Sequence, residues 1–333
     1  MSANDMKISV ITPSFNQAVF LEQTIKSVLG QGYSNLEYIV IDGGSSDGSV
    51  DIIKRYADQL AYWVSEPDSG QVAAINKGFR RATGEIVCWL NSDDVLMPGA
   101  LANVAAAFRD PSVEWVVGQC CVIDQAGSEK QRFESRYSSD PASWFRIATD
   151  FFLPQPSSFW RRSVLDRLGY LDEAMHYAFD YEYWLRMLTH GLRPMLVDDV
   201  LAGFRTHDSS KSCSQPIGFY RENVMVWKRY RGYCPQEDLS VLDRRILKET
   251  LEVLELEAQA LLGEGRHGAA YGALVKAAMA SPQLLLQRGF YRLLAKVGVS
   301  GPDGTGFHRA GVRGKRGNHR EHKDHKDWES FPL

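Results

Sequence analysis

Apolar and polar positions follow two different periods along the first third of the chain. Short β-branched runs, typical of buried strands, alternate with stretches in which apolar residues recur every three or four positions, typical of helices. The expected strands are 7–12, 36–41, 62–64, 85–90 and 113–118, and the expected helices are 19–29, 49–57, 71–82 and 99–108. This alternation predicts βαβ units, and therefore an α/β fold in which helices flank a mostly parallel sheet.

The pattern changes twice further along the chain. Beyond residue 120 it predicts strands at 157–160, 196–200 and 201–205 and helices at 162–168 and 181–189, and from 217 to 297 it is mainly helical, with a long helix at 239–262. Residues 300–333 are rich in Gly, Arg, Lys and His and poor in apolar residues, so we expect disorder there. The sequence therefore predicts an α/β domain over 1–212, a helical extension over 213–299 and a disordered basic tail.

Composition adds limits on the class of protein. The chain is 44% hydrophobic and 24% charged, as in ordinary soluble proteins, and its net charge of −3 gives no reason to expect nucleic acid as a partner. Its five cysteines form no spaced framework, its first residues are polar, and no apolar stretch reaches the roughly 20 residues that span a bilayer. These features predict a cytoplasmic protein with free thiols.

Polar clusters follow four of the expected strands, at 13–16, 42–48, 66–70 and 91–94. The carboxyl ends of parallel strands meet at one edge of a sheet, where ligands bind, so these clusters predict a site. The last cluster contains two adjacent carboxylates, Asp93 and Asp94, which indicate either a metal ion or a turn that caps the next helix. The glycine signatures of dinucleotide-binding folds, P-loops and serine hydrolases are missing from the sequence.

Taken in order, these clusters and three later ones resemble the glycosyltransferases of family 2, which have the Rossmann-like GT-A fold. The matching segments are 10–16, 41–49, 66–78, 90–94, 155–162, 179–186 and 204–207. The resemblance covers about residues 7–210. Each motif is weak alone, but seven in the right order are a specific signal.

The resemblance implies transfer of a sugar, with inversion, from a nucleotide-diphosphate sugar, for which we expect a UDP-sugar. A divalent cation, Mn²⁺ or Mg²⁺, would take up charge on the departing diphosphate. The implied metal ligands are Asp93, Asp94 and His207, and the implied donor contacts are Pro13, Asp42, Asp68, Asn76 and Asp93. Asn91 stands where many relatives have Asp, which predicts a metal site of lower charge.

The resemblance also implies acceptor-side roles. Asp180 is the expected general base, since an attacking sugar hydroxyl must lose its proton, although its place at a helix start also suits an N-cap. Gln155 and Trp184 are the expected acceptor-side residues, with core packing as the alternative for Trp184. For His207, the alternative to metal binding is a histidine in a surface loop. For Asp42, the alternative to donor binding is a residue that forms its own turn.

We expect the acceptor to be a saccharide or a lipid-linked glycan. Residues 281–297 form a basic amphipathic segment, which predicts either peripheral contact with the inner face of a membrane or docking onto the protein core or a second subunit. Two other functions are open. A sugar-nucleotide nucleotidyltransferase would need a Gly- and Lys-rich first loop, which 13–17 is not, and a non-catalytic glycan-binding scaffold would show damaged acids, whereas Asp42, Asp68, Asp93 and Asp180 are present.

Overall fold

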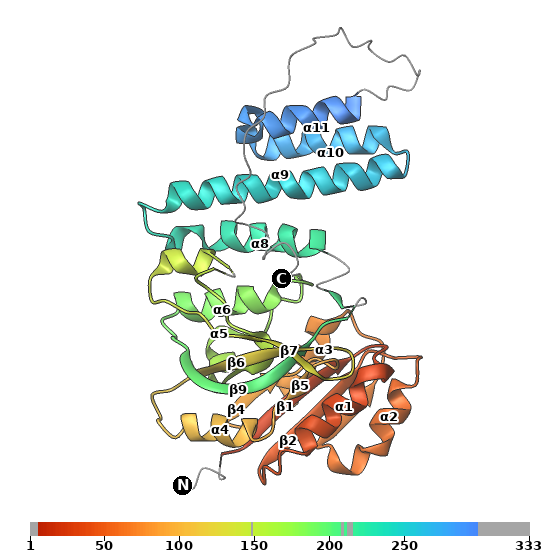
Figure 1. Ribbon diagram of the computed structural model, residues 1–333, viewed down its shortest axis with the longest axis vertical. Helices are drawn as coiled ribbons and strands as arrows, with labels where there is room; N and C mark the ends of the chain where they lie inside the picture. The colour runs from red at the N-terminus through yellow and green to blue at the C-terminus, as the bar shows by residue number, and fades with distance from the viewer. Residues whose placement is uncertain (1–5, 148, 208–209, 212–215, 299–333) are drawn as a thin grey trace.

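The computed structural model describes residues 6–147, 149–207, 210–211 and 216–298. Within these residues the strands form one nine-stranded sheet in the order β3-β2-β1-β4-β8-β6-β9-β5, with β7 added beside β6 (Figure 1). The strands are β1 (Ile8–Ser14), β2 (Leu36–Asp42), β3 (Tyr62–Ser65), β4 (Ile86–Trp89), β5 (Val95–Leu96), β6 (Trp115–Ile123), β7 (Glu129–Phe133), β8 (Ser158–Arg161) and β9 (Met195–Arg205).

The sheet is parallel in its first half and mixed in its second. β1 pairs in parallel with β2 and with β4, and β2 pairs in parallel with β3. β8 then runs antiparallel to both β4 and β6, while β9 is parallel to β6. The predicted α/β fold is confirmed. The two strands expected at 196–200 and 201–205 are one strand, β9. Its pairing with β6 shifts in register around Gln119 and then continues.

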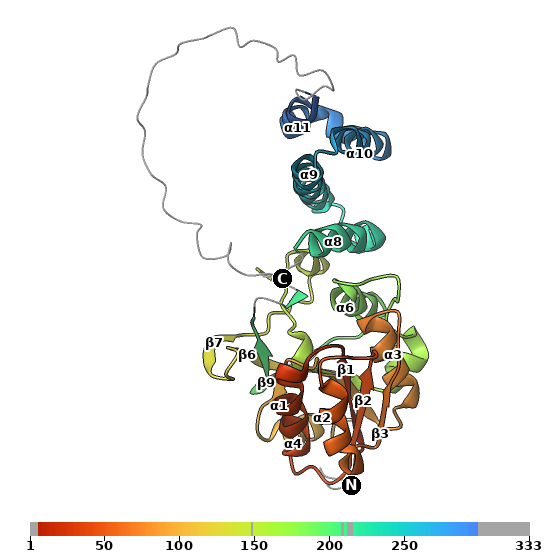
Figure 2. The same ribbon diagram turned by 90° about the vertical axis from the view of Figure 1, so that its right-hand side faces the viewer.

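Helices cover both faces of the sheet, because residues that alternate along β1 point to opposite sides. Ile8 and Val10 pack in one apolar cluster with α1, α2 and α4, whereas Ile11 packs in another with α3, α5 and α6 (Figure 2). The helices are α1 (Ala18–Leu29), α2 (Ser49–Arg55), α3 (Gln71–Arg81), α4 (Ala100–Ala107), α5 (Ser163–Leu168) and α6 (Phe179–Thr189).

Four tryptophans form the centre of the second cluster. Trp89, Trp115, Trp160 and Trp184 are all at most 2% exposed, and the ring of Trp184 lies 5.9 Å from that of Trp89 and 5.2 Å from that of Trp115. These rings bring α6 onto β4 and β6, so the start of α6 is fixed next to the carboxyl end of β4.

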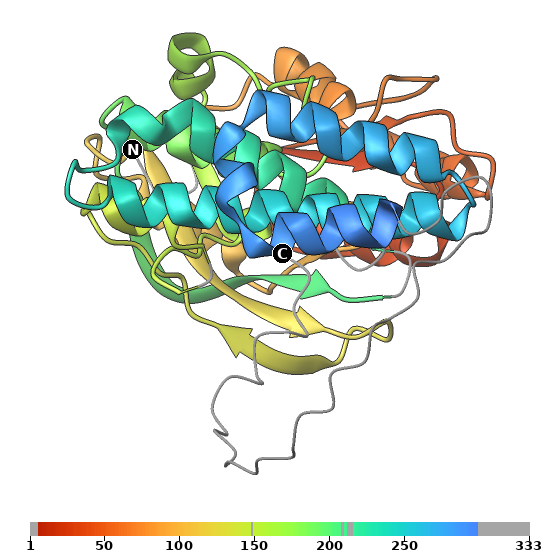
Figure 3. The ribbon, with the colours of Figure 1, turned by 90° about the horizontal axis from the view of Figure 1, so that it is seen from above.

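Four further helices stack away from the sheet along the long axis of the molecule (Figures 1 and 3). They are α8 (Pro216–Tyr230), α9 (Leu239–Gly263), α10 (His267–Ala280) and α11 (Arg288–Gly298). α8 and the first half of α9 belong to the same apolar cluster as α6, whereas the end of α9 forms a separate cluster with α10 and α11. The division at 212 and 213 stays a prediction, and the tail expected at 300–333 lies outside the described residues.

The amphipathic segment 281–297 is a 3₁₀ turn followed by α11. Its apolar residues Leu284, Phe290, Leu293 and Val297 are at most 4% exposed and pack against α9 and α10. This is the docking alternative, so that face is closed to a bilayer. Across the described residues, no helix combines the length and the apolarity that a bilayer crossing requires.

Candidate functional site

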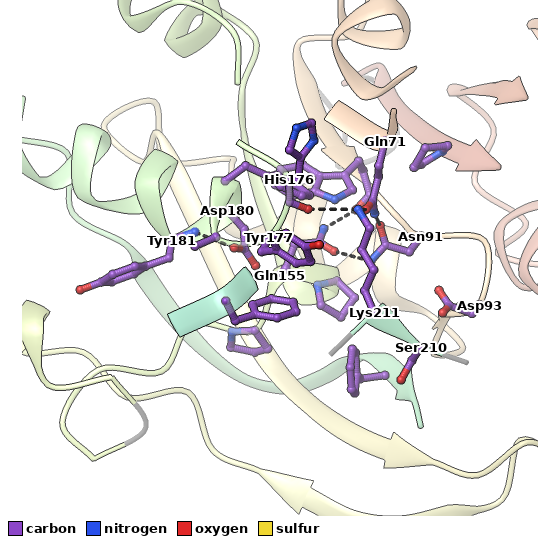
Figure 4. Close-up of a pocket in the computed structure, with 18 of the residues that line it drawn as sticks. Gln71, Asn91, Asp93, Gln155, His176, Tyr177, Asp180, Tyr181, Ser210 and Lys211 are labelled. Carbon is purple, nitrogen blue, oxygen red and sulfur yellow. Dashed lines mark hydrogen bonds between the residues drawn. The ribbon is translucent and has the colours of Figure 1, made fainter. Parts of the chain in front are cut away.

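A cavity of about 750 Å³ opens at the carboxyl edge of the parallel strands. It lies between the loops after β1, β2 and β4 on one side and the starts of α6 and α8 on the other (Figure 4). The predicted site residues that line it are Pro13, Asp68, Asp93, Gln155, Asp180 and Trp184. The structure therefore brings together donor-side and acceptor-side residues that lie far apart in the sequence.

At one end, the cavity wall is made by the interlocked loops after β1 and β2. Asp42 is fully buried, and its carboxylate accepts hydrogen bonds from the backbone N–H of Ser45 at 2.9 Å, from the Ser45 hydroxyl at 2.6 Å and from the Ser65 hydroxyl at 2.7 Å. Asp42 thus organises the turn, which is the alternative given above, and a second role toward a donor stays a prediction.

Polar groups nearby face the cavity instead. Asp68 is exposed at the wall, where it accepts a hydrogen bond from the backbone N–H of Gly70 at 2.8 Å. The Ser14 hydroxyl is buried at the same wall and has no hydrogen-bond partner among the described residues. Buried polar groups are nearly always paired, so we expect this hydroxyl to bond to water or to a ligand in the cavity.

The two adjacent carboxylates after β4 have different surroundings. The Asp93 side chain is 19% exposed and faces the cavity, and its Oδ2 lies 3.1 Å from Nε2 of His207, a buried residue that follows β9. Asp94 is 1% exposed; its Oδ1 accepts from the backbone N–H of Arg205 at 2.9 Å and its Oδ2 from Nδ2 of Asn91 at 3.2 Å. Burial, and then the neighbouring Asp93, raise the pKa of Asp94 well above its usual range.

The metal role predicted for Asp94 stays a prediction. Its Oδ1 holds the loop to β9 and its Oδ2 bonds to Asn91 within the same loop, and Asp94 is not among the residues that line the cavity. Asp93 and His207 face each other at 3.1 Å, although only Asp93 lines the cavity, and their predicted role as metal ligands stays a prediction. The described residues contain no group of three or more His, Cys, Asp or Glu side chains arranged to hold a metal ion.

Asn91 lies at the centre of a side-chain network beneath the cavity. Its Oδ1 accepts from Nε2 of Gln71 at 2.8 Å, and its Nδ2 donates to Oε1 of Gln155 at 3.1 Å as well as to Asp94. Gln155 in turn donates to the carbonyl of Trp89 at 2.8 Å. An Asp at position 91 would face two acceptors without a donor, so Asn91 suits this network.

Asn76, predicted as a donor contact, also has another role. It is 1% exposed, and its amide bonds to the carbonyl of Leu171 at 3.0 Å, to the N–H of Leu171 at 3.1 Å and to Glu173 at 2.9 Å. All its capacity for strong hydrogen bonds is directed away from the cavity, which it does not line. Asn76 therefore ties α3 to the segment before α6.

Asp180 is the second residue of α6, and its carboxylate faces the cavity (Figure 4). The N-cap position is Ala178, so the capping alternative does not describe Asp180. Its Oδ1 accepts from the backbone N–H of Tyr181 at 2.7 Å. Burial, and secondarily the charge of Glu222, raise the pKa of Asp180 to about 6. Trp184, one turn later, is buried and forms part of the cavity floor.

Two residues that the sequence interpretation missed hold the segment before Asp180. The carboxylate of Glu222, on α8, accepts from the backbone N–H groups of His176, Tyr177 and Ala178, each at 2.8 Å. The Nζ of Lys211 donates to the carbonyl of His176 and to Oε1 of Gln71, both at 3.0 Å. A Glu at 222 on an amphipathic helix gave no signal of this contact.

Lys211 reaches across the cavity between Asp93 and Asp180 (Figure 4). It is the one Lys or Arg among the described residues that line the cavity. The site therefore combines a carboxylate–imidazole pair, a single cation and a separate carboxylate of raised pKa. Such an arrangement suits a ligand with an anionic centre next to a group that loses a proton.

The sequence profile of Glycosyl transferase family 2 matches residues 9–169. The chain is 33% identical over 230 residues to an uncharacterized glycosyltransferase of Mycobacterium tuberculosis, with 67% of this chain and 85% of the relative covered. It is 28% identical over 192 residues to GalNAc(5)-diNAcBac-PP-undecaprenol beta-1,3-glucosyltransferase of Campylobacter jejuni, with 54% and 59% covered. The chain belongs to glycosyltransferase family 2 and is an enzyme of that family. It spans only 54% of the length of a further relative from Nostoc.

Solved structures show the same fold. The S. aureus TarS fragment 1–349 aligns with a TM-score of 0.56 at 19% identity, covering 88% of each chain. The mannosyltransferase PcManGT of Pyrobaculum calidifontis, in complex with GDP-Man and Mn²⁺, aligns with a TM-score of 0.55 at 22% identity, covering 88% of this chain and 84% of its own. TarS 1–349 has also been solved with UDP-GlcNAc, and aligns at 16% identity with a TM-score of 0.54, covering 75% of this chain and 81% of its own. The GT-A fold is thereby established.

Proposed function

We propose that this enzyme transfers a sugar, with inversion, from a UDP-sugar to a hydroxyl of a saccharide or lipid-linked glycan, and that it depends on a divalent cation. The observation that supports this most directly is the cavity in which Asp93, the partner of His207, and Asp180 lie on opposite sides of Lys211 (Figure 4). The lipid-linked acceptor rests on the name of the Campylobacter relative.

The donor would occupy the end of the cavity formed by the loops after β1 and β2. The unpaired hydroxyl of Ser14 and the exposed carboxylate of Asp68 offer an acceptor and donor set for a base and a ribose, and Pro13 shapes the wall between them. The diphosphate would then extend past Asp93 toward Lys211, which supplies a positive charge.

The residues present fit a divalent cation. A carboxylate oxygen and an imidazole nitrogen 3.1 Å apart form a donor set that Mn²⁺ accepts, and the remaining positions suit diphosphate oxygens and water. Asp93 and His207 would hold the ion, and Asn91 would not, because its oxygen bonds to Gln71. When bound, such an ion offsets the negative charge that grows on the diphosphate as it leaves.

Asp180 would act as the general base. Its carboxylate is in the cavity and accepts one short backbone hydrogen bond, so its other lone pairs can accept the proton of an acceptor hydroxyl. A pKa of about 6 keeps it ionised at neutral pH while making it a stronger base than an ordinary Asp. Attack from this side, opposite to the proposed position of the diphosphate, would invert the anomeric carbon.

A thermal-shift screen of nucleotide sugars tests this function. We expect a UDP-sugar to raise Tm in the presence of Mn²⁺ by more than it does with EDTA, since only binding to the folded state stabilises the protein. If only a GDP-sugar stabilised the protein, the nucleobase of the donor would be guanine and not uracil. A screen in which no nucleotide sugar shifts Tm with either Mn²⁺ or Mg²⁺ would refute the proposal.

We further propose that Glu222 positions Asp180. Replacing Glu222 by Gln leaves at least one of three backbone N–H groups, of which that of Ala178 is buried, without an acceptor, which costs about 1–3 kcal/mol and loosens the start of α6. We expect kcat to fall about 10- to 100-fold, with little change in the donor KM. The acid limb of the pH–rate profile should also move to lower pH, because the charge of Glu222 contributes to the raised pKa of Asp180.

Glu257→Gln is the matched control. It breaks the ion pair with Arg221, the neighbour of Glu222 on α8, and does not touch the cavity. We expect wild-type kcat and an unchanged pH profile. If Glu222→Gln behaved like this control, or if it lowered Tm without moving the pH profile, Glu222 would have no role beyond structure.

A further inference from the structure

We propose that the end of the molecule formed by α10, α11 and the turn between them binds an anionic lipid surface. This end lies farthest from the sheet (Figures 1 and 2). The biological reason for this contact rests on the proposed function, since a lipid-linked acceptor would be met at a membrane. The contact itself is inferred from exposure and charge.

Exposed large hydrophobic side chains are concentrated at this end. On α10, Tyr271, Val275 and Met279 are spaced by four residues, so they form one stripe, and they are 53%, 37% and 79% exposed. The stripe continues into the turn, where Leu285 is 44% and Leu286 is 82% exposed. An apolar stripe of this length on a helix surface marks an interaction site rather than the scatter of single residues that is normal elsewhere.

These side chains are not needed by the fold of the extension. The cluster that joins α9, α10 and α11 is filled by other residues, such as Leu274, Leu284, Phe290 and Leu293, all of them buried. The exposed residues lie on the opposite side of the same helices. Their exposure is therefore a property of the surface and not of a poorly packed core.

The charge of this end favours an anionic partner. Residues 265–298 contain five Lys or Arg residues and no Asp or Glu, whereas the whole chain has a net charge of −3. Two of the five are paired with acids at the end of α9, Arg266 with Glu264 and Lys296 with Glu255, so the attraction to an anionic partner rests on the other three. Arg288 and Arg292 are both exposed on α11, one turn apart, and Tyr291 beside them is 56% exposed. An anionic bilayer would attract this end and repel the remainder, which orients the molecule.

The combination of apolar side chains that can enter the headgroup region with flanking Lys and Arg residues is what interfacial helices use. It differs from the contact that the sequence predicted, because the apolar face of α11 is buried and the stripe on α10 takes its place. An acidic protein partner would match the charge but would leave no reason for Met279 and Leu286 to be so exposed.

Flotation of the full chain with vesicles tests the proposal, without donor or acceptor present. We expect the protein to float with phosphatidylcholine vesicles of which about one quarter of the lipid is phosphatidylglycerol, and to stay at the bottom with pure phosphatidylcholine. Added salt should weaken binding, because part of it is electrostatic. Because flotation measures no turnover, its result is independent of the donor screen. Either assay can fail while the other succeeds.

Two variants separate the contributions. Met279→Asp combined with Leu286→Asp should lower vesicle binding at least about 10-fold, and Arg288→Glu combined with Arg292→Glu should do so about 10- to 100-fold. Val241→Asp, at a residue 50% exposed on α9, is the control and should bind like the wild type. All these variants should keep the wild-type response to donor, because none of the residues lines the cavity.

Two outcomes would overturn the proposal. Flotation of the Met279→Asp, Leu286→Asp variant as strong as that of the wild type would exclude this surface. A wild type that fails to float, but that forms dimers in light scattering which the same variant abolishes, would assign the surface to contact between two copies of the chain.

Discussion

Replacement of Asp180 by Asn is expected to abolish sugar transfer and, at the same time, to make the protein more stable. The amide keeps the size of the side chain and can still accept from the N–H of Tyr181, but it cannot take a proton. Loss of a general base lowers kcat by about 10²- to 10⁴-fold. Donor binding should be unchanged, since Asp93, the proposed diphosphate-side residue, lies on the other side of Lys211 (Figure 4).

The stability gain follows from the pKa of Asp180. In the folded protein this pKa is about 6, whereas an unfolded Asp has about 3.9, so between these values the folded state holds more protons. The free energy of unfolding therefore falls as pH rises from about 4 to about 6, and above pH 6 the buried charge costs on the order of 1–3 kcal/mol. An amide carries no charge, so Asp180→Asn should raise Tm at pH 8 but not at pH 4.

The pH dependence of the wild type gives an independent measurement. Transfer should rise through an apparent pKa near 6 as Asp180 ionises. Glu222 from α8 is the charged group that helps to raise the pKa of Asp180, so this limb should move in Glu222→Gln if Asp180 is responsible for it. Retained transfer by Asp180→Asn, or a Tm that falls at pH 8, would remove Asp180 as the base.

The sequence predicted the fold and the location of the site because both depend on short-range patterns. The alternation of strands and helices up to β4 and the polar clusters at strand ends are local features that indicated the sheet edge at which Asp93 lies, whereas Asp180 was identified through the family resemblance; both residues line one cavity. The mixed half of the sheet depends on pairing between distant strands, such as β6 with β9, which leaves no periodic signal in either segment.

Individual roles were harder to predict, because they depend on which way a side chain turns. Asn76 and Asp94 lie in motif positions, yet their hydrogen bonds go to Leu171 and Arg205 on distant segments. Glu222 is the reverse case, because it lies in no recognisable motif. Its carboxylate nevertheless accepts hydrogen bonds from three backbone N–H groups of the loop before α6. Such contacts are set by tertiary packing, and only a structure shows them.

The adjacent carboxylates Asp93 and Asp94 should respond in opposite ways to the same substitution. Asp93→Ala removes one of two facing ligands at the cavity, so we expect the Mn²⁺-dependent part of donor stabilisation to disappear. Transfer should fall by about 10³-fold, as several kcal/mol of charge stabilisation are lost. Tm without ligand should stay close to that of the wild type, because the side chain of Asp93 is partly exposed.

Asp94→Ala is both the matched comparison and the stricter test. It leaves the buried N–H of Arg205 and Nδ2 of Asn91 without their acceptor, which should cost about 1–3 kcal/mol and lower Tm by several degrees. At temperatures where this variant is folded, it should still bind donor in a Mn²⁺-dependent manner, since Asp93 and His207 are in place. Loss of Mn²⁺ dependence in Asp94→Ala with an unchanged Tm would reverse the two roles and make Asp94 the metal ligand after all.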